Sequence, residues 1–570
     1  MKLLYKHIRK DFFAKKTMVV ILSLFVMFTS FLYFFVRFSV DKNLDIYRSL
    51  DKASLKSNEL KYLTALESNV VLIRYMTFGM VLIFSLILFL YISNTMKKNR
   101  AKVGHIQSLG YEMGDIAKGY GFVTLIMALP SVIAGFVAGF FGSQILISAY
   151  HETYSVDGSL RGIHFSTFMK GTVLLAIFAA VVAYVACISF GNKDVALLIK
   201  NADSSDKKPG IVEKFIGLFK LKNGYKYKLT FKNISEILLL VTAIVTFSIM
   251  FVLSVSLILS SSEIMKSQRD GRAYAYETTY DECMEGESDT ESEVHFLKFA
   301  ATIDDKGKKI DYNIVGIVGD NKLLTLYDNK NKEINLSAEE GIVLNPELSE
   351  NYGIKIGDEL GVEIAGNVYT VKATAVARNA GVKTMYMSKE KLTELLGLNE
   401  NSYNGVFSDK QVDGGETVAY EDVMEALSRD QTSNKTSAVI NQSIGVITGC
   451  LLIFLAMFIG LSSNTESILI FDLLGYDSKK INRTLLDPYM VVSNIIFVIT
   501  LPICVFAAKR IQISTSLATG DYMPFQLSVF TVVYMFVILN LLCFLVRAVF
   551  TLKIKKIMSG EKQSEYLYEW

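Results

Sequence analysis

The sequence predicts a polytopic α-helical membrane protein with about eight transmembrane helices, arranged as two 1+3 repeats, and one α+β domain between the fifth and sixth helices. Two observations predict this fold class. Long apolar runs without charge recur along a chain that is 51% apolar and 20% charged overall. Acidic residues concentrate in one long polar segment after the fifth run. Buried helices of a soluble protein do not repeat such runs eight times.

Each apolar run has roughly the 20 residues that a helix needs to cross the ~30 Å hydrocarbon core of a bilayer. A helix is expected because lipid offers no partner for backbone N–H and C=O groups. The first run follows six basic residues, but it is longer than a signal-peptide core and no small-x-small cleavage site follows it, so it is predicted to stay as an uncleaved helix. The charge-free runs are Thr17–Val36, Tyr75–Met96, Gly119–Tyr150, Gly171–Asn192, Ile237–Ser262, Thr436–Thr465, Pro488–Ala508 and Tyr522–Val546.

Basic residues predict the orientation of the helices. Segments 1–16, 97–118 and 193–232 carry six, five and ten Lys and Arg residues, and they fall on one side if each run spans once. By the positive-inside bias this side is cytoplasmic, which places both termini in the cytoplasm and the long polar segment outside the cell membrane. The predicted divisions are a cytoplasmic amphipathic N-terminus (1–16), a first repeat (17–192, with a short external loop at 37–74), a basic cytoplasmic linker (193–236), the fifth helix (237–262), the external domain (263–435), helices six to eight (436–546) and a cytoplasmic tail (547–570).

Charge separates the external segment from the rest of the chain. Residues 261–438 hold 33 acidic and 19 basic residues, whereas the remainder holds 23 acidic and 40 basic ones. Only one of the five cysteines, Cys283, lies outside a predicted helix. An intrachain disulfide is therefore excluded there, and the external domain needs its own core.

Two pairs of matching segments indicate an internal duplication. Lys2–Ile8 precedes the first helix and Lys228–Ile234 precedes the fifth, with basic and apolar positions coinciding at an offset of 226. Leu109-Gly110-Tyr111 follows the second helix and Leu474-Gly475-Tyr476 follows the sixth, at an offset of 365. Internal repeats are common in transport proteins, because two related halves can form a site or a gate between them.

The two Leu-Gly-Tyr segments, within 97–118 and 466–487, are the candidate functional residues on the cytoplasmic side. Apolar residues recur around them at helical spacing, which fits two readings equally: a helix lying at the membrane surface, or a coupling helix that docks on a partner. The coupling candidates are Ile106, Leu109, Gly110, Tyr111, Phe471, Leu474, Gly475 and Tyr476.

The external domain is predicted to mix strands and helices. Gly341–Asn345 is typical of a short strand, Leu360–Ile364 and Val368–Val376 of a hairpin, and Ser388–Leu396 of a helix that Gly397 ends. Residues 281–293 contain seven acidic residues and are predicted to be a solvated loop, with a patch for cationic ligands as the alternative. The residues of that candidate patch are Asp281, Glu282, Glu285 and Glu287.

Signatures of catalysis and of cofactor binding are missing from the sequence. Gly381-Val382-Lys383-Thr384 lacks the Gly-Lys-Ser/Thr core of a P-loop, and no zinc-protease or serine-hydrolase motif occurs. The predicted membrane helices hold almost no ionisable residues, whereas ion-coupled carriers place acidic groups near the midplane. We therefore expect a non-enzymatic chain that binds no metal, cofactor or nucleic acid and takes its energy from outside.

The order of one helix, an external segment and three helices resembles the FtsX-like permeases of ABC transporters, the group that includes MacB and the Lol permeases. Leu109-Gly110-Tyr111 and Leu474-Gly475-Tyr476 look like the cytoplasmic segment that this family has after its second helix. Gly341–Val376 is similar to the periplasmic core domain of MacB-type permeases. The duplication within one chain looks most like the BceB type of Gram-positive bacteria, which handles antimicrobial peptides.

The resemblance implies a permease subunit that is powered by separate cytoplasmic ATPases, so that ATP acts only through those partners. Two halves in one chain imply two ATPase copies, docking near Gly110 and Gly475, whose closure moves the external domain (mechanotransmission). A peptide or lipid-like substrate is implied, with antimicrobial peptide export or resistance as the expected role. The alternative is a non-transporting regulator or sensor that relays ATPase motion or ligand binding to a partner such as a histidine kinase.

Overall fold

The computed structural model describes residues 2–14, 16–50, 55–154, 156, 160–190, 226–227, 230, 234–288, 291–305, 308–319 and 321–558. These residues divide into two compact units. The first is helical and comprises 1–254, 440–510 and 528–570; the second comprises 255–439 and 511–527 and contains every strand of the described chain. The predicted linker 193–236 and the end of the tail lie largely outside the described residues.

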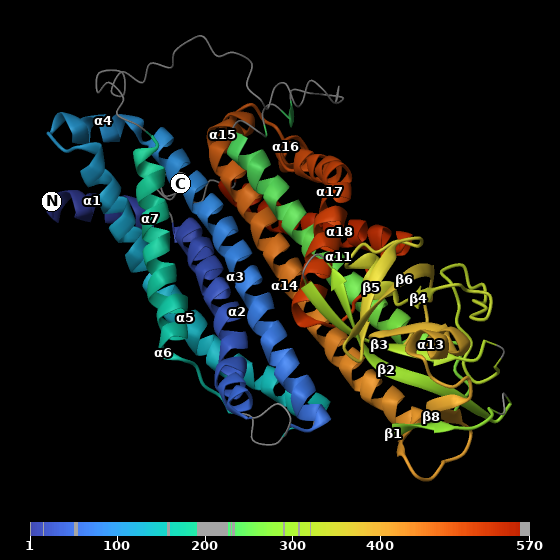
Figure 1. Ribbon diagram of the computed structural model, residues 1–570. Helices are drawn as coiled ribbons and strands as arrows, with labels where there is room; N and C mark the ends of the chain where they lie inside the picture. Colours follow the sequence, from blue (N-terminus) through green and yellow to red (C-terminus); the bar gives the residue numbers. More distant parts are fainter. Residues whose placement is uncertain are drawn as a thin grey trace. The chain divides into compact units, whose positions relative to one another are not determined.

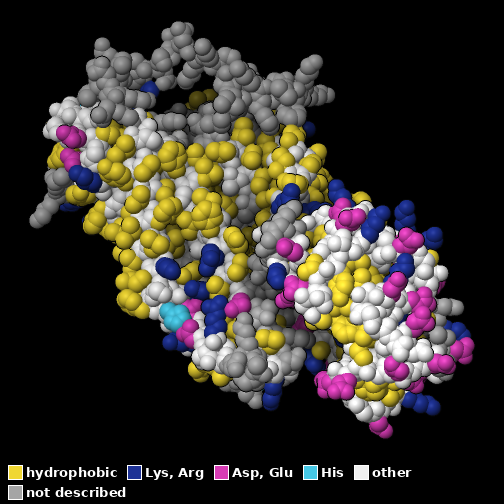
Figure 2. All heavy atoms as spheres, viewed as in Figure 1, with side chains coloured by type: hydrophobic (Ala, Val, Ile, Leu, Met, Phe, Trp, Pro, Cys, Tyr) yellow, Lys and Arg dark blue, Asp and Glu magenta, His cyan; other side chains and the backbone are white. Residues whose placement is uncertain are grey.

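Within the described part of the chain, eight helices are long and apolar enough to cross a membrane, which agrees with the predicted number. The chain is a multi-pass membrane protein. Figure 2 shows hydrophobic side chains over much of the visible face of the helices, whereas Asp, Glu, Lys and Arg side chains are scattered over the surface of the inserted domain. The spans lie in α2 (Lys16–Ser49), α3 (Ser57–Lys98), α5 (Met113–Tyr154), α6 to α7 (Phe165–Ile188), α11 (Ile234–Arg269), α14 (Tyr420–Ser463), α16 to α17 (Ser478–Thr519) and α18 (Val529–Met558).

In the first repeat, α2 packs on α5, and α5 packs on α7 (Figure 1). The amphipathic α1 (Lys2–Ala14) lies along α5 and buries Leu4, Ile8 and Phe12. Segment 37–74, expected to be a short loop, is instead largely helical, because α2 continues to Ser49 and α3 begins at Ser57. The extended helix ends have their own apolar contacts, which include Tyr47, Tyr62, Leu66, Leu146, Tyr150 and Tyr154.

The inserted domain is built on a closed barrel. Strands β2 (Glu293–Asp305), β3 (Lys308–Ile317), β7 (Thr384–Ser388), β4 (Ile342–Leu344), β6 (Asn367–Val376) and β5 (Glu359–Ile364) form a ring, since β2 pairs with both β5 and β3. The far end of β2 pairs instead with β8 (Ser402–Ser408), which continues the sheet into β1 (Tyr276–Glu285) and β9 (Glu416–Ala419). A barrel has no free edge within its ring, and its alternating residues fill the interior.

The local elements predicted for this domain are present. The expected short strand is β4, the expected hairpin is β5–β6, and the expected helix is α13 (Lys389–Leu396). A short helix, α12 (Pro346–Glu350), follows β4. Asn345 caps α12 by accepting the Glu347 N–H, and Gly397 ends α13 at φ 68°. Buried Leu297, Ile303, Ile314, Val362, Met385 and Leu392 belong to the core.

Three membrane helices reach into the second unit. Residues 255–269 of α11, 420–439 of α14 and 511–519 of α17 belong to it, as does the connection that follows α17. The predicted domain boundaries of 263 and 435 therefore cut through continuous helices, and segment 511–527 was not expected in the domain. The acidic segment after residue 281 also differs from its prediction: β1 extends to Glu285, so its first residues lie on a strand with a register shift between Thr279 and Met284.

Candidate functional site

The first Leu-Gly-Tyr segment is a tight turn between two helices. Asn99 begins α4 (Arg100–Ser108), Leu109 ends it, and Gly110 follows with φ 89°. The Gly110 N–H donates to the Gln107 carbonyl at 2.9 Å, and α5 starts at Met113. A left-handed residue just after a helix favours glycine because a Cβ atom would strain the backbone. Space is not the reason for this glycine, since a Cβ atom there would meet nothing within 4 Å.

The second segment has the same backbone. Asn464 begins α15 (Thr465–Leu473), Leu474 ends it, and Gly475 has φ 77°. The Gly475 N–H donates to the Asp472 carbonyl at 2.9 Å. Leu109 and Leu474 have nearly the same backbone angles, φ −81° in both and ψ 5° and 4°. The two matching sequences therefore fold into two matching turns, one in each repeat.

Each turn buries one apolar face and exposes its leucine. Val103 and Ile116 are buried beside the first turn, and Ile468 and Ile481 beside the second. Leu109 is 77% exposed and Leu474 is 66% exposed. The remaining candidates line the turns: Ile106, Tyr111 and Phe471 are half-buried, and Tyr476 packs its ring on Phe471 with the centroids 5.4 Å apart. Contiguous exposed apolar side chains, such as Leu473 and Leu474, mark surfaces that bind a partner, whereas a single exposed one such as Leu109 is common on any protein surface.

The second turn is tied to the chain just before α11. The side-chain amide of Asn464 donates to the Thr230 carbonyl at 3.2 Å, and the Thr230 hydroxyl donates to the Thr484 carbonyl at 3.1 Å. Beside this contact, Glu236 in the first turn of α11 is fully buried, and its carboxylate approaches Gly460 of α14. Residues at the outer ends of α15 and α16 (Ser478–Leu485) therefore contact Thr230, four residues before α11 begins.

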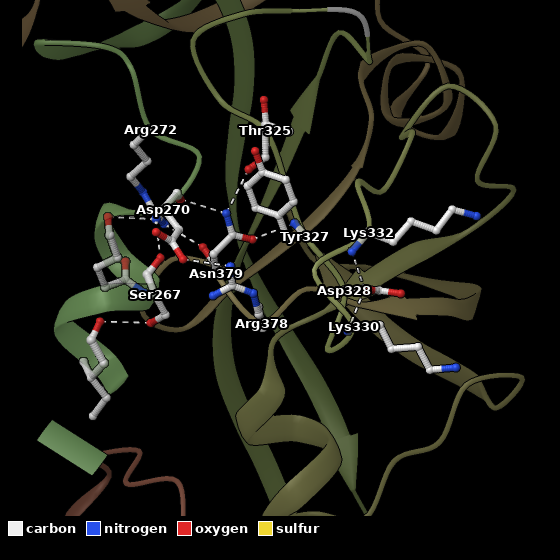
Figure 3. A network of polar contacts seen from close by, with 12 residues as sticks. Ser267, Asp270, Arg272, Thr325, Tyr327, Asp328, Lys330, Lys332, Arg378 and Asn379 are labelled. Atoms are coloured by element: carbon white, nitrogen blue, oxygen red, sulfur yellow. Dashed lines mark hydrogen bonds and ion pairs between the residues drawn. The ribbon is translucent and has the colours of Figure 1, made fainter. Parts of the chain in front are cut away.

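The other end of α11 is held by a network of polar contacts that we call the Asn379 clamp (Figure 3), formed by Gln268, Asp270, Arg272, Thr325, Tyr327, Arg378, Asn379 and Ala380. The buried Asn379 amide donates to the Asp270 and Thr325 carbonyls at 2.9 and 2.8 Å, and its oxygen accepts the Tyr327 N–H at 2.8 Å. Arg378 pairs with Asp270 at 2.7 Å. One side chain thus joins the helix end to two segments of the barrel domain.

Further bonds surround the clamp. Arg272 donates to the Gln268 and Asn379 carbonyls, both at 3.0 Å, and the Gln268 amide donates to the Ala380 carbonyl at 2.7 Å. Next to Tyr327, the Asp328 carboxylate accepts the backbone N–H groups of Lys332 and Lys330, which lowers its pKa. Hydrogen bonds to an ionised carboxylate favour its charged form.

The end of α17 is bound to the same domain through α12. Asn351, which follows α12, donates to the Ser516 hydroxyl at 2.9 Å. Burial is the main cause of the raised pKa of Tyr522, and the nearby Glu350 carboxylate raises this pKa further. Within α12, buried Glu347 accepts a 2.5 Å hydrogen bond from Tyr312 of β3, and burial raises the pKa of its carboxyl group.

The acidic candidate patch is exposed on the surface. Asp281, Glu282 and Glu285 lie on β1 and Glu287 on the turn after it, and all four are exposed. Glu285 accepts a hydrogen bond from the Asn399 amide at 2.9 Å. Among the described residues, no group of His, Cys, Asp and Glu side chains is arranged to hold a metal ion.

Sequence reasoning missed the residues that anchor α11. Asn379 and Thr230 are single polar residues whose partners lie far away in the chain, so no local pattern marks them. Glu236 lies one residue before the charge-free run that begins at Ile237, so it was not counted as part of the predicted membrane helix. A buried carboxylate at a helix start could have been suspected from the apolar residues that follow it.

Comparison with known protein families found one match in each half of the chain. A model of the FtsX-like permease C-terminal domain matches residues 75–190 and again residues 443–558. Each match contains one Leu-Gly-Tyr turn and the three helices around it. The search of curated proteins gave no match.

Proposed function

We propose that the chain, two regions of which match the FtsX-like permease C-terminal domain, is the permease component of an ABC transporter and couples ATP hydrolysis by separate cytoplasmic ATPase subunits to motion of its inserted domain. The proposed orientation places the two turns and both termini in the cytoplasm and the inserted domain outside the cell membrane. The basic residues at segments 1–16 and 97–118 support this orientation.

One observation carries the proposal: α11 is a single helix with polar anchors at both ends. Its start lies beside the second turn through Asn464 and Thr230, and its end lies in the Asn379 clamp. A packed helix that changes position at one end moves at the other, because protein interiors are densely packed and compress little. Displacement of the turn by an ATPase would therefore reach the barrel domain along α11.

The exposed leucines of the turns are the proposed ATPase contacts. Leu109 and Leu474 stand at equivalent positions, so one permease would bind two ATPase subunits, one at each turn. Affinity purification of the tagged full-length protein in mild detergent should recover two copies of a P-loop ATPase per chain. Leu109→Asp or Leu474→Asp should each remove one copy. Failure to recover any ATPase from monodisperse protein would contradict the proposal and favour a sensor or regulator.

Transmission can be tested separately from docking. Asn379→Ala should leave ATPase binding and ATP hydrolysis in place but abolish the antimicrobial peptide resistance that we propose the protein gives to cells; protection below means this resistance. The matched control is Asn404→Ala: Asn404 also bonds strand backbone at 2.7 and 2.9 Å, but it lies on β8, away from α11. Equal loss of protection in both variants would show that barrel stability matters, rather than the attachment of α11.

For the substrate, we propose a cationic antimicrobial peptide or a complex containing one. The acidic excess of residues 261–438 supports this choice, because a field of one sign concentrates ligands of the opposite sign. Neutralising the four patch residues (D281N, E282Q, E285Q, E287Q) should reduce peptide resistance more than neutralising four exposed acidic residues elsewhere in the domain (E340Q, E394Q, E400Q, D409N). Equal effects would mean that the patch is not the attracting surface.

A further inference from the structure

The two turns share a backbone but present different side chains to a partner. At the offset of 365, Asn99 corresponds to Asn464, Leu109 to Leu474 and Gly110 to Gly475. These pairs have the same roles at the start of the helix, at its end and in the left-handed position. The same offset can therefore be used to compare the two exposed surfaces position by position.

The second turn is more apolar. Ile470 and Leu473 stand where the first turn has His105 and Ser108. Ile470 is 56% exposed and Leu473 is 84% exposed, next to Leu474. The first turn offers Leu109 alone, with the exposed polar side chains of His105 and Ser108 beside it.

The first turn is more basic. Lys97, Lys98, Arg100 and Lys102 stand where the second repeat has Ser462, Ser463, Thr465 and Ser467. Segment 97–118 holds five basic and two acidic residues, whereas segment 466–487 holds three basic and four acidic ones. At these four positions the first repeat thus carries basic side chains, whereas the second repeat carries hydroxyl groups and has acidic residues nearby, Glu466 and Asp472.

We propose that the two turns bind their ATPase subunits by different forces, the first mainly by charge and the second mainly by burial of Ile470, Leu473 and Leu474. This inference rests on the proposed function. The partner surface is an ATPase groove with an apolar pocket for the shared leucine and an acidic rim that faces Arg100 and Lys102, whose exposed ammonium group also pairs with Asp11 at 3.3 Å. Exposed charge pairs weaken with salt, because the screening length falls from ~10 Å at 0.1 M to ~3 Å at 1 M. Apolar burial does not weaken in this way.

The two ATPase sites should therefore differ in their response to salt. We would purify the full-length permease with its ATPase and determine the stoichiometry by native mass spectrometry between about 0.05 M and about 0.5 M salt, a range over which screening of exposed charges increases strongly. Two ATPase copies per permease are expected at low salt and one at high salt. The copy that remains should be the one at the second turn.

Exchange of corresponding residues identifies which turn holds which copy. Leu473→Ser gives the second turn the first turn's residue and should remove the salt-resistant copy. Ser108→Leu makes the opposite exchange and should keep both copies bound at high salt. Both side chains are exposed, so neither change removes a packed residue; monodispersity of each permease variant alone controls for folding.

Two outcomes would overturn the inference. Loss of both copies at the same salt concentration would show that the sites are equivalent, as would exchanges that leave the salt dependence unchanged. In either case the proposed function would stand, because ATPase would still bind at low salt. Absence of ATPase at every salt concentration would instead overturn the proposed function and this inference with it.

Discussion

The two repeats place their glycines on different helices. In the first repeat, Gly135 and Gly139 of α5 lie against α2: a Cβ atom at Gly135 would overlap the Met27 carbonyl oxygen, and one at Gly139 would come within 2.7 Å of the Phe34 Cβ. In the second repeat, Gly445 and Gly449 of α14 lie against Met250 and Phe247 of α11. These glycines thus join the first and third spans of the first repeat but the first and second spans of the second repeat, where Gly460 of α14 also faces Tyr489 of α17.

The difference shows that a duplicated order of helices does not fix which pair packs most closely. Helices in lipid associate through close packing and interhelical hydrogen bonds, so small residues decide where backbones can meet. In the first repeat the Ser30 hydroxyl also donates to the Val132 carbonyl at 3.0 Å, across the α2–α5 contact. The contacts have diverged while both turns kept their backbone.

One added methyl group at Gly135 is expected to have a large effect. Gly135→Ala should lower the free energy of unfolding by about 1–3 kcal/mol, because the nearest atoms belong to the α2 backbone and must shift. Gly449→Ala makes the same chemical change at a site where the nearest atom is the Phe247 Cβ at 3.1 Å, so its effect should be smaller. Thermal unfolding of both variants in detergent measures the difference. Equal unfolding midpoints would show that the two contacts are equally tight.

A buried asparagine holds the end of the first helix in each repeat, Asn43 at α2 and Asn379 at α11. Asn379→Ala should cost about 2–3 kcal/mol, because it removes three hydrogen bonds and leaves buried backbone groups unsatisfied. In the first repeat, buried Asn43 of α2 makes a similar set of bonds, with the Leu160 N–H at 2.7 Å and the Ser39 and Leu160 carbonyls at 2.8 and 2.9 Å.

Hydrogen exchange would locate these effects. In Asn379→Ala, amides at 325–327 should exchange faster, while amides at 160–164 keep their wild-type rates. Asn43→Ala should show the reverse. Faster exchange throughout the chain in either variant would mean that the asparagine supports global stability and not a local attachment.

Much of the fold followed from local signals. The absence of charge over about 20 residues marks a membrane helix because the cost of burying an ion is large, and all eight such runs became spans. Gly397 ends a helix where expected, and Gly110 and Gly475 take the left-handed position just after a helix. These signals act within a few residues, so sequence alone reveals them.

The remaining features depend on distant partners. Closure of the barrel requires β2 to pair with both β3 and β5, and no pattern within β2 specifies that. The acidic stretch was predicted to be a loop because Asp and Glu are rare in strands, but pairing of β1 with β8 holds its first part extended. The Asn379 clamp joins residues more than 100 positions apart along the chain, so only the tertiary structure shows it.

The first repeat and the inserted domain differ in how they bury a carboxylate. Asp41 in the first repeat pairs with Arg37 at 3.1 Å, whereas Glu347 of the inserted domain accepts the Tyr312 hydroxyl, and burial raises its pKa. A raised carboxyl pKa means that the folded state binds the proton more tightly, so stability falls as pH rises from the unfolded pKa through the folded one.

Glu347→Gln should therefore raise the free energy of unfolding at neutral pH, by about 1.4 kcal/mol for each unit by which the pKa of Glu347 is raised. It should also make the free energy of unfolding depend less on pH between about pH 4.5 and neutrality. Urea unfolding followed by near-ultraviolet circular dichroism at several pH values measures this. The control is Glu359→Gln at an exposed position on β5, which should leave the pH dependence unchanged. A Glu347→Gln profile parallel to the wild-type profile would contradict the assignment.

The smallest effects are expected where the repeats agree. Gly110→Ala and Gly475→Ala should each lower the free energy of unfolding by about 1 kcal/mol, because both glycines have left-handed angles that alanine adopts only with strain. The two losses should match, since neither site has a neighbour within 4 Å that could change the cost. Gly114→Ala, in the first turn of α5 and equally open, should instead raise stability by about 0.5–1 kcal/mol, because alanine favours a helix over glycine. If the two losses in the free energy of unfolding differed by more than about 1 kcal/mol, the two turns would not share one backbone. The comparison of their surfaces residue by residue would then lose its basis.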